Sequence, residues 1–477
     1  MSLIIPANSA AASGGYAVAN SCRFNSGSSD SLTITPSSAS NRKTWTWSSW
    51  VKRSVLTSGD QSIFNSHTDA QNQLELYFNS DDSLYVTNRI SNTGANLRTN
   101  AKFRDVGAWY HIVLSVDTTQ GTDTNRMKLY VNGVQVTSFS ETGYPGVNTD
   151  TAVNNNVQHR IGDSNLETFF NGYIAEAVLI DGQALAPDQF GEFDEDSGIW
   201  KPIDVSGLTF GTNGFYLETK QSGTSQNSSG LGADTSGNDN HFAVNNLTAI
   251  DQTTDTCTNN FATLNPLFKQ DGVFSEGNLA YTIAASDFDS GVSTFGASSG
   301  KWYFETKITA TASGTTRNSV GICDARDGNY IAENEFGQPG SAIVGDTVGY
   351  TGNSSTAVFK NNSSEYSGTT YTTNDILCCA VDLDNGAVYY RKNGGSFLNS
   401  GDPTSGSSRT GAVTITTGET YLFGNTAYAG SAFAINFGSP PYSESGGETD
   451  GNGYGNFNQA VPSGYYALNT KNLAEYG

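Results

Sequence analysis

One run of acidic side chains has the residue types of a hydrolase, because carboxyl groups can act as acid, base or nucleophile. Glu192, Asp194, Glu195 and Asp196 follow one another closely and end at Ser197. Retaining glycoside hydrolysis needs two carboxyl groups about 5–5.5 Å apart across the scissile bond. The run is flanked by glycines and does not alternate as a strand would. We therefore predict an acidic turn here and no catalytic residue in the chain.

A nucleophilic serine and a metal-binding histidine pair each require a sequence context that this chain does not supply. The stretch 296–300, GASSG, fits the nucleophile-elbow pattern, but an elbow lies between a strand and a helix. Here an alternating run, KWYFETKI, follows it. The four histidines, His67, His111, His159 and His241, are scattered and form no HExxH pair. His111 falls in a predicted strand, where we expect a hydrogen-bonded sheet residue.

Acidic residues in predicted loops are candidate ligands for calcium. Calcium takes carboxylate and carbonyl oxygens as ligands. Asp163 comes directly after Ile161-Gly162, and Asp324 and Asp327 belong to the run DARDGN. These residues do not match an EF-hand loop, and ordinary Asp/Gly turns are the alternative. No other cofactor is expected.

The aromatic side chains fall into two groups, those in predicted loops and those in predicted strands. Tyr144, Tyr330 and Tyr366 fall in predicted loops, and loops on a rigid scaffold are where recognition residues gather. These three are the candidate ligand-binding residues. Trp47, Trp109 and Trp302 fall in strands that alternate between two faces, so we expect them in the core.

Charge and composition exclude some partners. Lys and Arg number 24 against 46 Asp and Glu, a formal charge of −22. Nucleic-acid binding depends on Lys and Arg neutralising phosphates, so we expect no nucleic-acid partner. No apolar run reaches the roughly 20 residues that span a bilayer, and residues 1–20 lack the basic start of a secretory signal. We expect no membrane insertion, and synthesis in a cytoplasm or assembly into something larger.

The five cysteines, Cys22, Cys257, Cys323, Cys378 and Cys379, are odd in number and include no CxxC pair. We expect buried free thiols. Cys378 and Cys379 are adjacent in a predicted strand, so their side chains should face opposite sides of a sheet.

The elements that must position these residues are strands. Short alternating runs with polar turns fill 21–200 and 272–440, with no helical period between them, which predicts an all-β chain of two antiparallel sandwiches and helix below roughly 10%. Residues 201–271 are predicted to be a connector, within which 221–240 is rich in Gly, Ser and Asn and has no core to bury. Residues 1–20 and 441–477 are predicted to be arms. A short helical turn is expected at Pro187.

Hairpin signals support this division. Asn132-Gly133 separates two alternating runs, and Asn385-Gly386 and Asn393-Gly394 do the same in the second half. Asn-Gly suits a type I′ turn, which needs φ > 0 at both central residues.

The first predicted sandwich resembles the LamG, or concanavalin A-like, family. The residues that carry the resemblance span roughly 21–200 and are Trp47, Trp50, 109–112 (WYHI), 129–133 (LYVNG), 161–162 (IG) and 170–176 (FNGYIAE). The resemblance implies two curved antiparallel sheets in a jelly roll, often with carbohydrate or protein binding at the loop rim. Related laminarinase-type glycosidases carry Glu-x-Asp-x-x-Glu, whose second Glu is replaced here by Ser197.

The second predicted sandwich resembles SPRY domains. The matching residues, within about 272–440, are 300–305 (GKWYFE), 320–322 (VGI), 348–350 (VGY), 381–386 (VDLDNG) and 436–438 (NFG). SPRY domains are non-catalytic modules that bind protein partners through loops at one end, so the resemblance implies such a role.

The joining pieces 181–207, 234–266 and 462–473 resemble connectors of virion proteins from tailed bacteriophages, especially marine ones. This resemblance implies a structural virion protein, assembled in the host cytoplasm and displayed on the particle exterior, that recognises host-surface glycan or protein without catalysis. A tail fibre or spike is expected first, and a capsid decoration or head fibre is the alternative. A glycan depolymerase whose carboxylate pair comes from distant strands is the enzymatic alternative. The expected partners are other virion proteins and copies of the same chain.

Overall fold

The computed structural model describes residues 15–56, 59–69, 71–90, 93–164, 168–268, 271–284, 287–311, 318–352 and 356–477. Strands make up 41% and helices 7% of the structure, which confirms the predicted all-β fold. The chain divides into two compact units, Ser13–Thr258 (the first unit) and Asn259–Gly477 (the second unit). No helix within the described ranges is long and apolar enough to cross a membrane.

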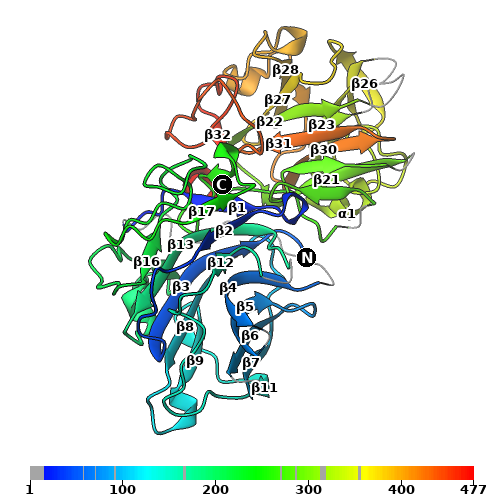
Figure 1. The fold of residues 1–477 in the computed structure, drawn as a ribbon. Helices are drawn as coiled ribbons and strands as arrows, with labels where there is room; N and C mark the ends of the chain where they lie inside the picture. The colour runs from blue at the N-terminus through cyan, green and yellow to red at the C-terminus, as the bar shows by residue number, and fades with distance from the viewer. Residues whose placement is uncertain are drawn as a thin grey trace. The chain divides into compact units, whose positions relative to one another are not determined.

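The first unit is a sandwich of two antiparallel sheets, seen as two layers in Figure 1. The first sheet has the order β10 (Val134–Gln135), β9 (Met127–Val131), β8 (Trp109–Asp117), β3 (Thr44–Arg53), β13 (Gly172–Asp181), β1 (Ser21–Phe24) and β18 (Gln252–Thr253), with β16 (Phe215–Leu217) also on β13. The second has the order β11 (Phe139–Thr142), β7 (Thr93–Lys102), β6 (Ser83–Ile90), β5 (Asn72–Phe78), β4 (Gln61–Asp69), β12 (His159–Ile161), β2 (Ser31–Ile34) and β17 (Ala243–Asn245). Short 3₁₀ helices are Ser26–Ser28, Asp123–Asn125, Pro187–Gln189 and Ala249–Asp251, so the expected turn at Pro187 is confirmed.

The core of the first unit follows from strand alternation. Trp45 and Trp47 lie two residues apart on β3, and both are fully buried between the sheets. Trp47 stacks on Phe64 of β4, with ring centroids 4.1 Å apart. Trp50 packs in a different cluster with Val18 and Ala175, which covers the other face of the sheet. The first sheet is therefore buried on both faces near β3 and β13.

The predicted connector is instead part of the first unit up to Thr258. Its residues form β16, β17 and β18, and Leu231 and Phe242 are fully buried in the sandwich core. The expectation that 221–240 has no core to bury is wrong. Asp234 explains how a polar stretch can fold there, because its carboxylate accepts hydrogen bonds from the backbone N–H groups of Tyr216, Ser236 and Asn240.

The described end of the N-terminal arm is docked on this unit. Residues 1–14 lie outside the described residues. Val18 is 4% exposed, its N–H donates to Thr258 Oγ1, and its carbonyl accepts from the hydroxyls of Thr256 and Thr258. Residues 15–20 therefore form a strap across the outer face of the first sheet.

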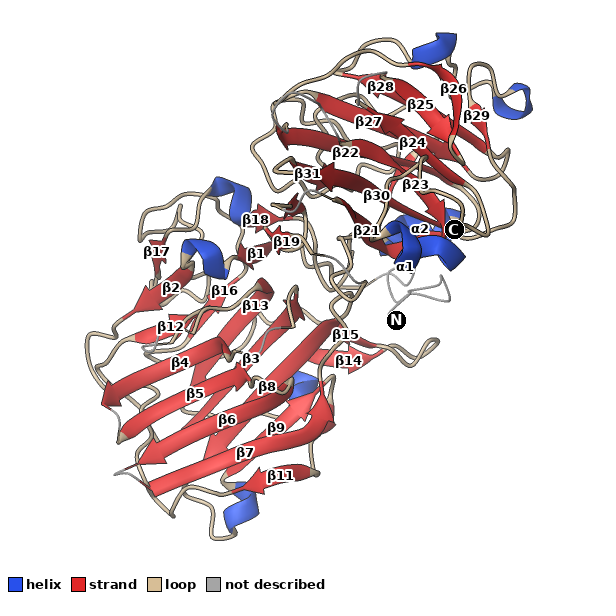
Figure 2. Ribbon diagram, turned by 90° about the vertical axis from the view of Figure 1, so that its right-hand side faces the viewer, coloured by secondary structure: helices blue, strands red, loops and turns tan. Residues whose placement is uncertain are grey.

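The second unit is also built from two sheets. One has the order β19 (Val273–Ser275), β20 (Ala280–Thr282), β31 (Ala432–Asn436), β22 (Lys301–Ala310), β27 (Ile376–Asp382), β28 (Ala387–Lys392) and β29 (Val413–Thr414), with β32 (Tyr466–Ala467) parallel to β22. The other has the order β21 (Phe288–Ala297), β30 (Tyr421–Tyr428), β23 (Ser319–Asp324), β24 (Thr347–Thr351), β25 (Ala357–Lys360) and β26 (Ser363–Ser367) (Figure 2). Its helices are α1 (Gly328–Ile331), α2 (Thr470–Tyr476) and the 3₁₀ turns Ala325–Asp327, Leu398–Ser400 and Gly406–Ser408.

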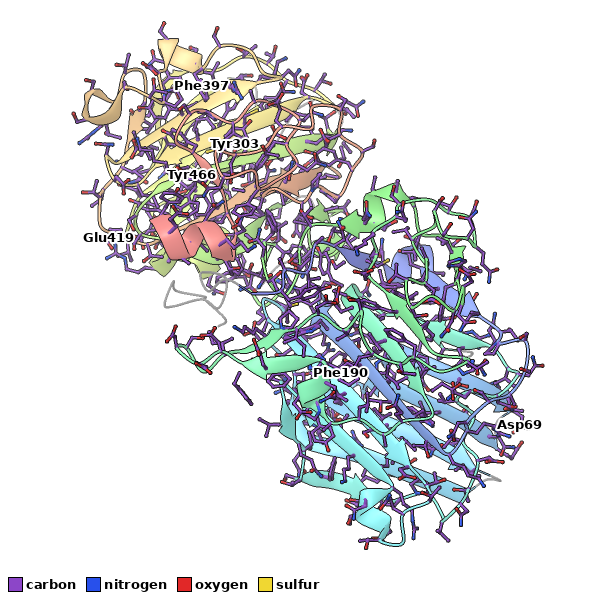
Figure 3. All side chains as sticks on the ribbon, turned by 90° about the vertical axis from the view of Figure 1, so that its left-hand side faces the viewer. Asp69, Phe190, Tyr303, Phe397, Glu419 and Tyr466 are labelled. Atoms are coloured by element: carbon purple, nitrogen blue, oxygen red, sulfur yellow. The ribbon has the colours of Figure 1, made fainter. Side chains whose placement is uncertain are left out.

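The C-terminal segment, predicted to be an arm, packs over one face of the second unit. Phe457, Tyr465 and Ala467 are buried against Tyr303, in a layer that also contains Phe397 (Figure 3). Beneath this layer, the Glu305 carboxylate on β22 accepts hydrogen bonds from the backbone N–H groups of Asn458 (2.9 Å) and Gln459 (2.8 Å). A buried acid on a strand thus fixes the segment to the sheet.

The cysteine pair and two of the three Asn-Gly turns have the geometry that the sequence predicts. Cys379 lies in the sandwich core and Cys378 in the outer layer, so the predicted opposite facing is confirmed. Asn132 and Gly133 both have positive φ (48° and 78°), as a type I′ turn requires. The loop at 383–386 differs, because only Gly386 has positive φ (65°) and the Asp382 carboxylate accepts the N–H of Asn385. Asn393 and Gly394 both have positive φ and turn as predicted.

Candidate functional site

The acidic run forms the predicted turn. It closes a separate two-stranded hairpin, β14 (Gly191–Phe193) and β15 (Trp200–Pro202), shown in Figure 2. Asp194 Oδ1 accepts the backbone N–H groups of Asp196 and Ser197 and the Ser197 hydroxyl, while Oδ2 pairs with Lys201 Nζ at 3.1 Å. The carboxylate of Asp194 is occupied in holding the turn.

The serine of the elbow-like stretch and His111 also have structural surroundings. Ser298 lies in the turn between β21 and β22, so the strand-to-helix context of an elbow is absent at this position. His111 is 1% exposed, and its Nδ1 accepts from Trp200 Nε1 at 3.0 Å. Nε2 therefore carries the proton and donates to Ser48 Oγ at 2.8 Å. Burial lowers the His111 pKa to about 3, and the residue is hydrogen-bonded within the sheet as the sequence predicts.

The predicted calcium ligands have protein partners. The Arg326 guanidinium forms two hydrogen bonds to the Asp324 carboxylate, at 2.9 and 2.6 Å. Asp327 accepts the N–H groups of Val344 and Gly345. Asp163 lies 3.7 Å from the Arg160 side chain. Within the described ranges, no group of three or more His, Cys, Asp or Glu side chains is arranged to hold a metal ion.

The three candidate tyrosines lie apart and are half-buried. Tyr144 is in the loop after β11 and packs against the first core. Tyr330 is in helix α1, where its hydroxyl donates to the Pro339 carbonyl. Tyr366 is on strand β26 and packs on the second core, so its expected loop position is wrong. Trp47 and Trp302 are fully buried as predicted, whereas Trp109 is half-buried and donates to the Asp255 carboxylate at 3.3 Å.

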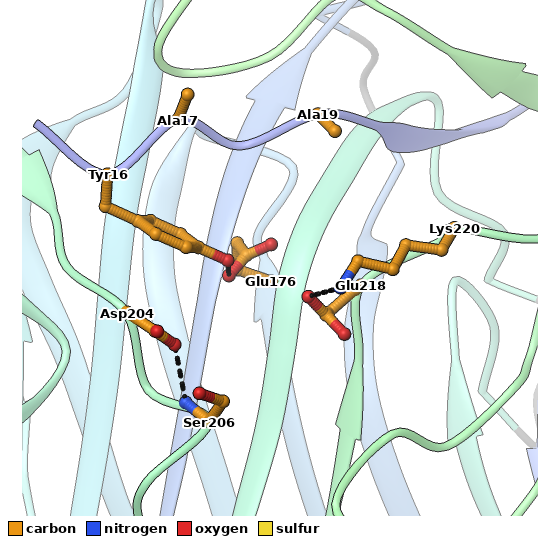
Figure 4. A pocket seen from close by; sticks show the side chains of 8 residues that line it. All are labelled: Tyr16, Ala17, Ala19, Glu176, Asp204, Ser206, Glu218 and Lys220. Atoms are coloured by element: carbon orange, nitrogen blue, oxygen red, sulfur yellow. Dashed lines mark hydrogen bonds and ion pairs between the residues drawn. The ribbon is translucent and has the colours of Figure 1, made fainter.

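A polar pocket of about 210 Å³ on the first unit brings together side chains from four parts of its chain (Figure 4). It is the candidate site of this unit. The strap, β13, the segment after β15 and the segment after β16 supply its lining, which is Tyr16, Ala17, Ala19, Glu176, Asp204, Ser206, Glu218 and Lys220. None of these residues is among the site residues that the sequence predicts.

A β-bulge places Glu176 in this pocket. Between two register pairs, β13 advances from Ala175 to Val178 while β3 advances only from Trp50 to Ser48, so β13 holds one extra residue. Glu176 has φ 52°, a left-handed conformation that is uncommon for a residue other than glycine. Ala175 faces the outer layer and Ala177 the sandwich core. In an unbroken strand Glu176 would have pointed into that core.

Two tyrosine hydroxyls hold the Glu176 carboxylate. Tyr216 donates to Oε2, Tyr16 lies 3.2 Å from the same oxygen, and the two hydroxyls are 2.9 Å apart. Glu176 is 6% exposed, and burial together with the nearby Glu218 charge raises its pKa to about 7. Both described bonds are made to Oε2, which leaves Oε1 as the oxygen available to a ligand.

The remaining polar residues of the pocket set its charge. Glu218 pairs with Lys220 at 2.6 Å, and Thr219 between them is buried with φ 54°. Asp204 accepts the N–H of Ser206 at 2.9 Å, which lowers the pKa of its carboxyl. Strained, buried polar groups around a cavity are typical of functional sites. A single acid within the apolar run 172–180 is the one sequence signal that pointed to this pocket.

Comparison with known proteins finds one family match, which lies within the first unit. Residues 26–189 match the sequence profile of the concanavalin A-like lectin/glucanases superfamily. No curated protein matches the chain. Many solved structures match, and among them is the SPRY domain of human HERC1, with 16% identity, a TM-score of 0.28, and coverage of 36% of this chain and 96% of that one.

Two further solved structures resemble parts of the chain. The heptameric SAP-like pentraxin from Limulus polyphemus has 17% identity and a TM-score of 0.25, covering 34% of this chain and 73% of that one. Domain 4 of AbnA, a GH43 extracellular arabinanase from Geobacillus stearothermophilus solved with arabinotriose, has 28% identity and a TM-score of 0.25, covering 31% and 65%. The family match and the observed strands agree that residues 26–189 form a concanavalin A-like domain within an all-β chain.

Proposed function

We propose that this chain is a structural protein of a tailed-phage virion, displayed on the particle exterior, that recognises a host-surface glycan or protein without catalysis. The proposal has two parts, a recognition role for the β-sandwich and a position on the particle. Each part rests on a different kind of support.

The recognition part rests on the concanavalin A-like domain together with the use of its acidic side chains. This fold serves in lectins and in glucanases. In this chain the run that comes nearest to a glycosidase motif is a turn, with Asp194 bonded to Ser197 and Lys201. A sandwich whose motif carboxylate is occupied in this way suits binding better than hydrolysis.

The virion part is supported by the resemblance of the joining pieces to connectors of tailed-phage proteins. A tail fibre or spike is the first choice, and a capsid decoration or head fibre is the alternative. Virion appendages attach at symmetric positions, so we expect a homo-oligomer bound to other virion proteins.

One observation favours a second candidate function, glycan depolymerisation. Glu176 has its pKa raised to about 7 and lies in a pocket with Glu218. A general acid in hydrolysis needs such a raised pKa, and a second carboxylate would complete the pair. Glu176 and Glu218 are thus the residues that this alternative requires.

Incubation with capsular or algal polysaccharides separates the two functions. The proposal expects retention of the polysaccharide by the full chain with no new reducing ends. New reducing ends that disappear in Glu176→Gln or Glu218→Gln, but persist in Glu192→Gln at the exposed hairpin, would establish the depolymerase instead.

A further inference from the structure

Hydrogen-bond acceptors predominate in the pocket around Glu176, because its donors Ser206 N–H and Lys220 Nζ are already directed at Asp204 and Glu218. Tyr216 uses its proton on Glu176, and the Tyr16 proton is directed at the same carboxylate and at the Tyr216 oxygen. Glu176 Oε1 and the Asp204 and Glu218 carboxylates remain as acceptors. A ligand that fills the pocket must therefore bring donors.

Charge narrows the class of ligand further. The lining holds three carboxyl groups, Glu176, Asp204 and Glu218, against one cation, Lys220. The chain as a whole carries −22, so its field repels anions and attracts cations. Phosphate, sulfate and carboxylate ligands are disfavoured on both counts.

The buried carboxylate lacks a cation of its own. Glu176 is 6% exposed and forms no ion pair with any described residue, while Lys220 pairs with Glu218. An ionised carboxylate removed from water is costly unless it is paired. The bulge fixes Glu176 in this position, so a cationic ligand would supply the missing partner.

The pocket has room for a small organic molecule. Its volume is about 210 Å³, compared with roughly 30 Å³ per molecule of liquid water. Tyr16, Ala17 and Ala19 of the strap contribute to its lining, and the two alanines have small side chains. The volume suits a single sugar ring or a short chain.

We propose that this pocket binds a primary ammonium group of a small organic ligand, with Glu176 Oε1 and the Glu218 carboxylate as its acceptors. The ammonium group takes the place of Lys220 Nζ beside Glu218, since the Lys220 side chain is 55% exposed and free to swing into solvent. This inference adds a ligand class to the proposed recognition role. It rests on that role only in assuming that the first unit binds a ligand. An amino sugar of a cell-surface polysaccharide and a lysine-like alkylamine both present this chemistry.

Titration calorimetry of the full chain tests the assignment with matched small probes. The probes are glucosamine, glucose, N-acetylglucosamine and glucuronate, which share one ring, and butylamine as the alkylamine. We expect glucosamine to bind at least tenfold more tightly than glucose or N-acetylglucosamine, and glucuronate not to bind. Butylamine binding as tightly as glucosamine assigns the site to alkylamines, and weaker binding assigns it to amino sugars.

Three variants add further readouts, and the gain of affinity expected for one of them cannot result from misfolding. Glu176→Gln should weaken glucosamine binding at least tenfold, because it removes an acceptor charge and keeps the shape. Lys220→Met should strengthen binding several-fold, because it removes the internal competitor. Lys128→Met, on a different part of the same unit, should leave binding unchanged.

Several results would overturn the assignment. These are glucose binding as tightly as glucosamine, glucuronate binding at all, or no gain of affinity in Lys220→Met. If no amine binds while the chain still retains a surface polysaccharide, this inference fails and the recognition role stands. Amine binding by a chain that is absent from phage particles would leave the inference and refute the virion role.

Discussion

Replacing Glu176 by Gln should change how the stability of the first unit depends on pH. The substitution keeps the size of the side chain and the two tyrosine contacts and removes its ionisation. Glu176 has an ordinary pKa of 4.5 in the unfolded chain and a pKa of about 7 in the folded one. Between these values the folded state binds more protons than the unfolded state, so stability falls as pH rises from about 4.5 to about 7.

The size of the effect follows from the shift. Each unit of pKa difference corresponds to 1.36 kcal/mol, so the wild-type chain should lose on the order of 3 kcal/mol from this group across that interval. The Gln variant does not carry this loss. Its stability relative to wild type should therefore rise by about the same amount, with most of the change complete by pH 7.5. Glu75 and Glu305 also have raised pKa values, but they are common to both proteins and cancel in the difference.

Urea unfolding followed by tryptophan fluorescence provides the assay. Five of the six tryptophans, Trp45, Trp47, Trp50, Trp109 and Trp200, belong to the first unit, so the signal reports mainly on that unit. Wild type and variant are compared at intervals from pH 4.5 to pH 8.

A control variant should show no such rise between pH 4.5 and pH 8. Hydrogen bonds from Asn96 and Tyr85 lower the pKa of Glu141, so its contribution is present above its unfolded pKa of 4.5 and is lost only as pH falls below that value. The stability difference between Glu141→Gln and wild type should therefore stay nearly constant over the assayed range. Parallel stability curves for wild type and Glu176→Gln would refute the raised pKa, and with it the view of Glu176 as a buried acid without a cation.

Three further predictions concern packing, the C-terminal segment and the thiols. Trp47→Ala should destabilise the first unit by about 3–5 kcal/mol, measured as a lower urea midpoint, because it removes a fully buried ring stacked on Phe64; a change below 1 kcal/mol would contradict its place in the core. Glu305→Ala should leave the second sandwich folded but expose 457–460 to protease and hydrogen exchange, because four donors from Tyr303, Asn436, Asn458 and Gln459 lose their acceptor; unchanged exchange there would contradict its anchoring role. No more than one thiol should react with a thiol reagent in the native chain, and all five after unfolding, because burial raises the pKa of Cys22, Cys323, Cys378 and Cys379; two or more fast native reactions would contradict this.

The strands and hairpins could be predicted because their signals are local. Alternation on β3 predicts Trp47 in the core, and Asn132-Gly133 predicts its own turn through the φ values that it favours. The same reasoning separated Cys378 from Cys379. Each of these features depends on residues within a few positions of one another.

The segments between the strands could not be predicted in this way. Residues 221–240 look solvated, yet Leu231 is buried because Asp234 satisfies three backbone N–H groups of the fold. The C-terminal segment looked free because its anchor, Glu305, lies about 150 residues earlier in the chain. Hydrogen bonds between residues far apart in the chain produce no local pattern in the sequence.

The candidate pocket was missed for the same reason. Its lining comes from four separate segments, and Glu176 reaches it only through a β-bulge that a period-2 pattern does not reveal. The candidate tyrosines are predicted to be loop residues, whereas Tyr366 lies on a strand and Tyr330 in a short helix. A lone acid within an apolar strand is the sequence signal that marks this pocket.

The proposed virion role is tested most directly by locating the chain in a density map of intact phage particles that encode it. The proposal predicts density for both sandwich units on the particle exterior, repeated with the symmetry of a tail fibre, spike, capsid decoration or head fibre. Absence of the chain from purified particles, with free protein in the lysate or the host cell, would contradict it.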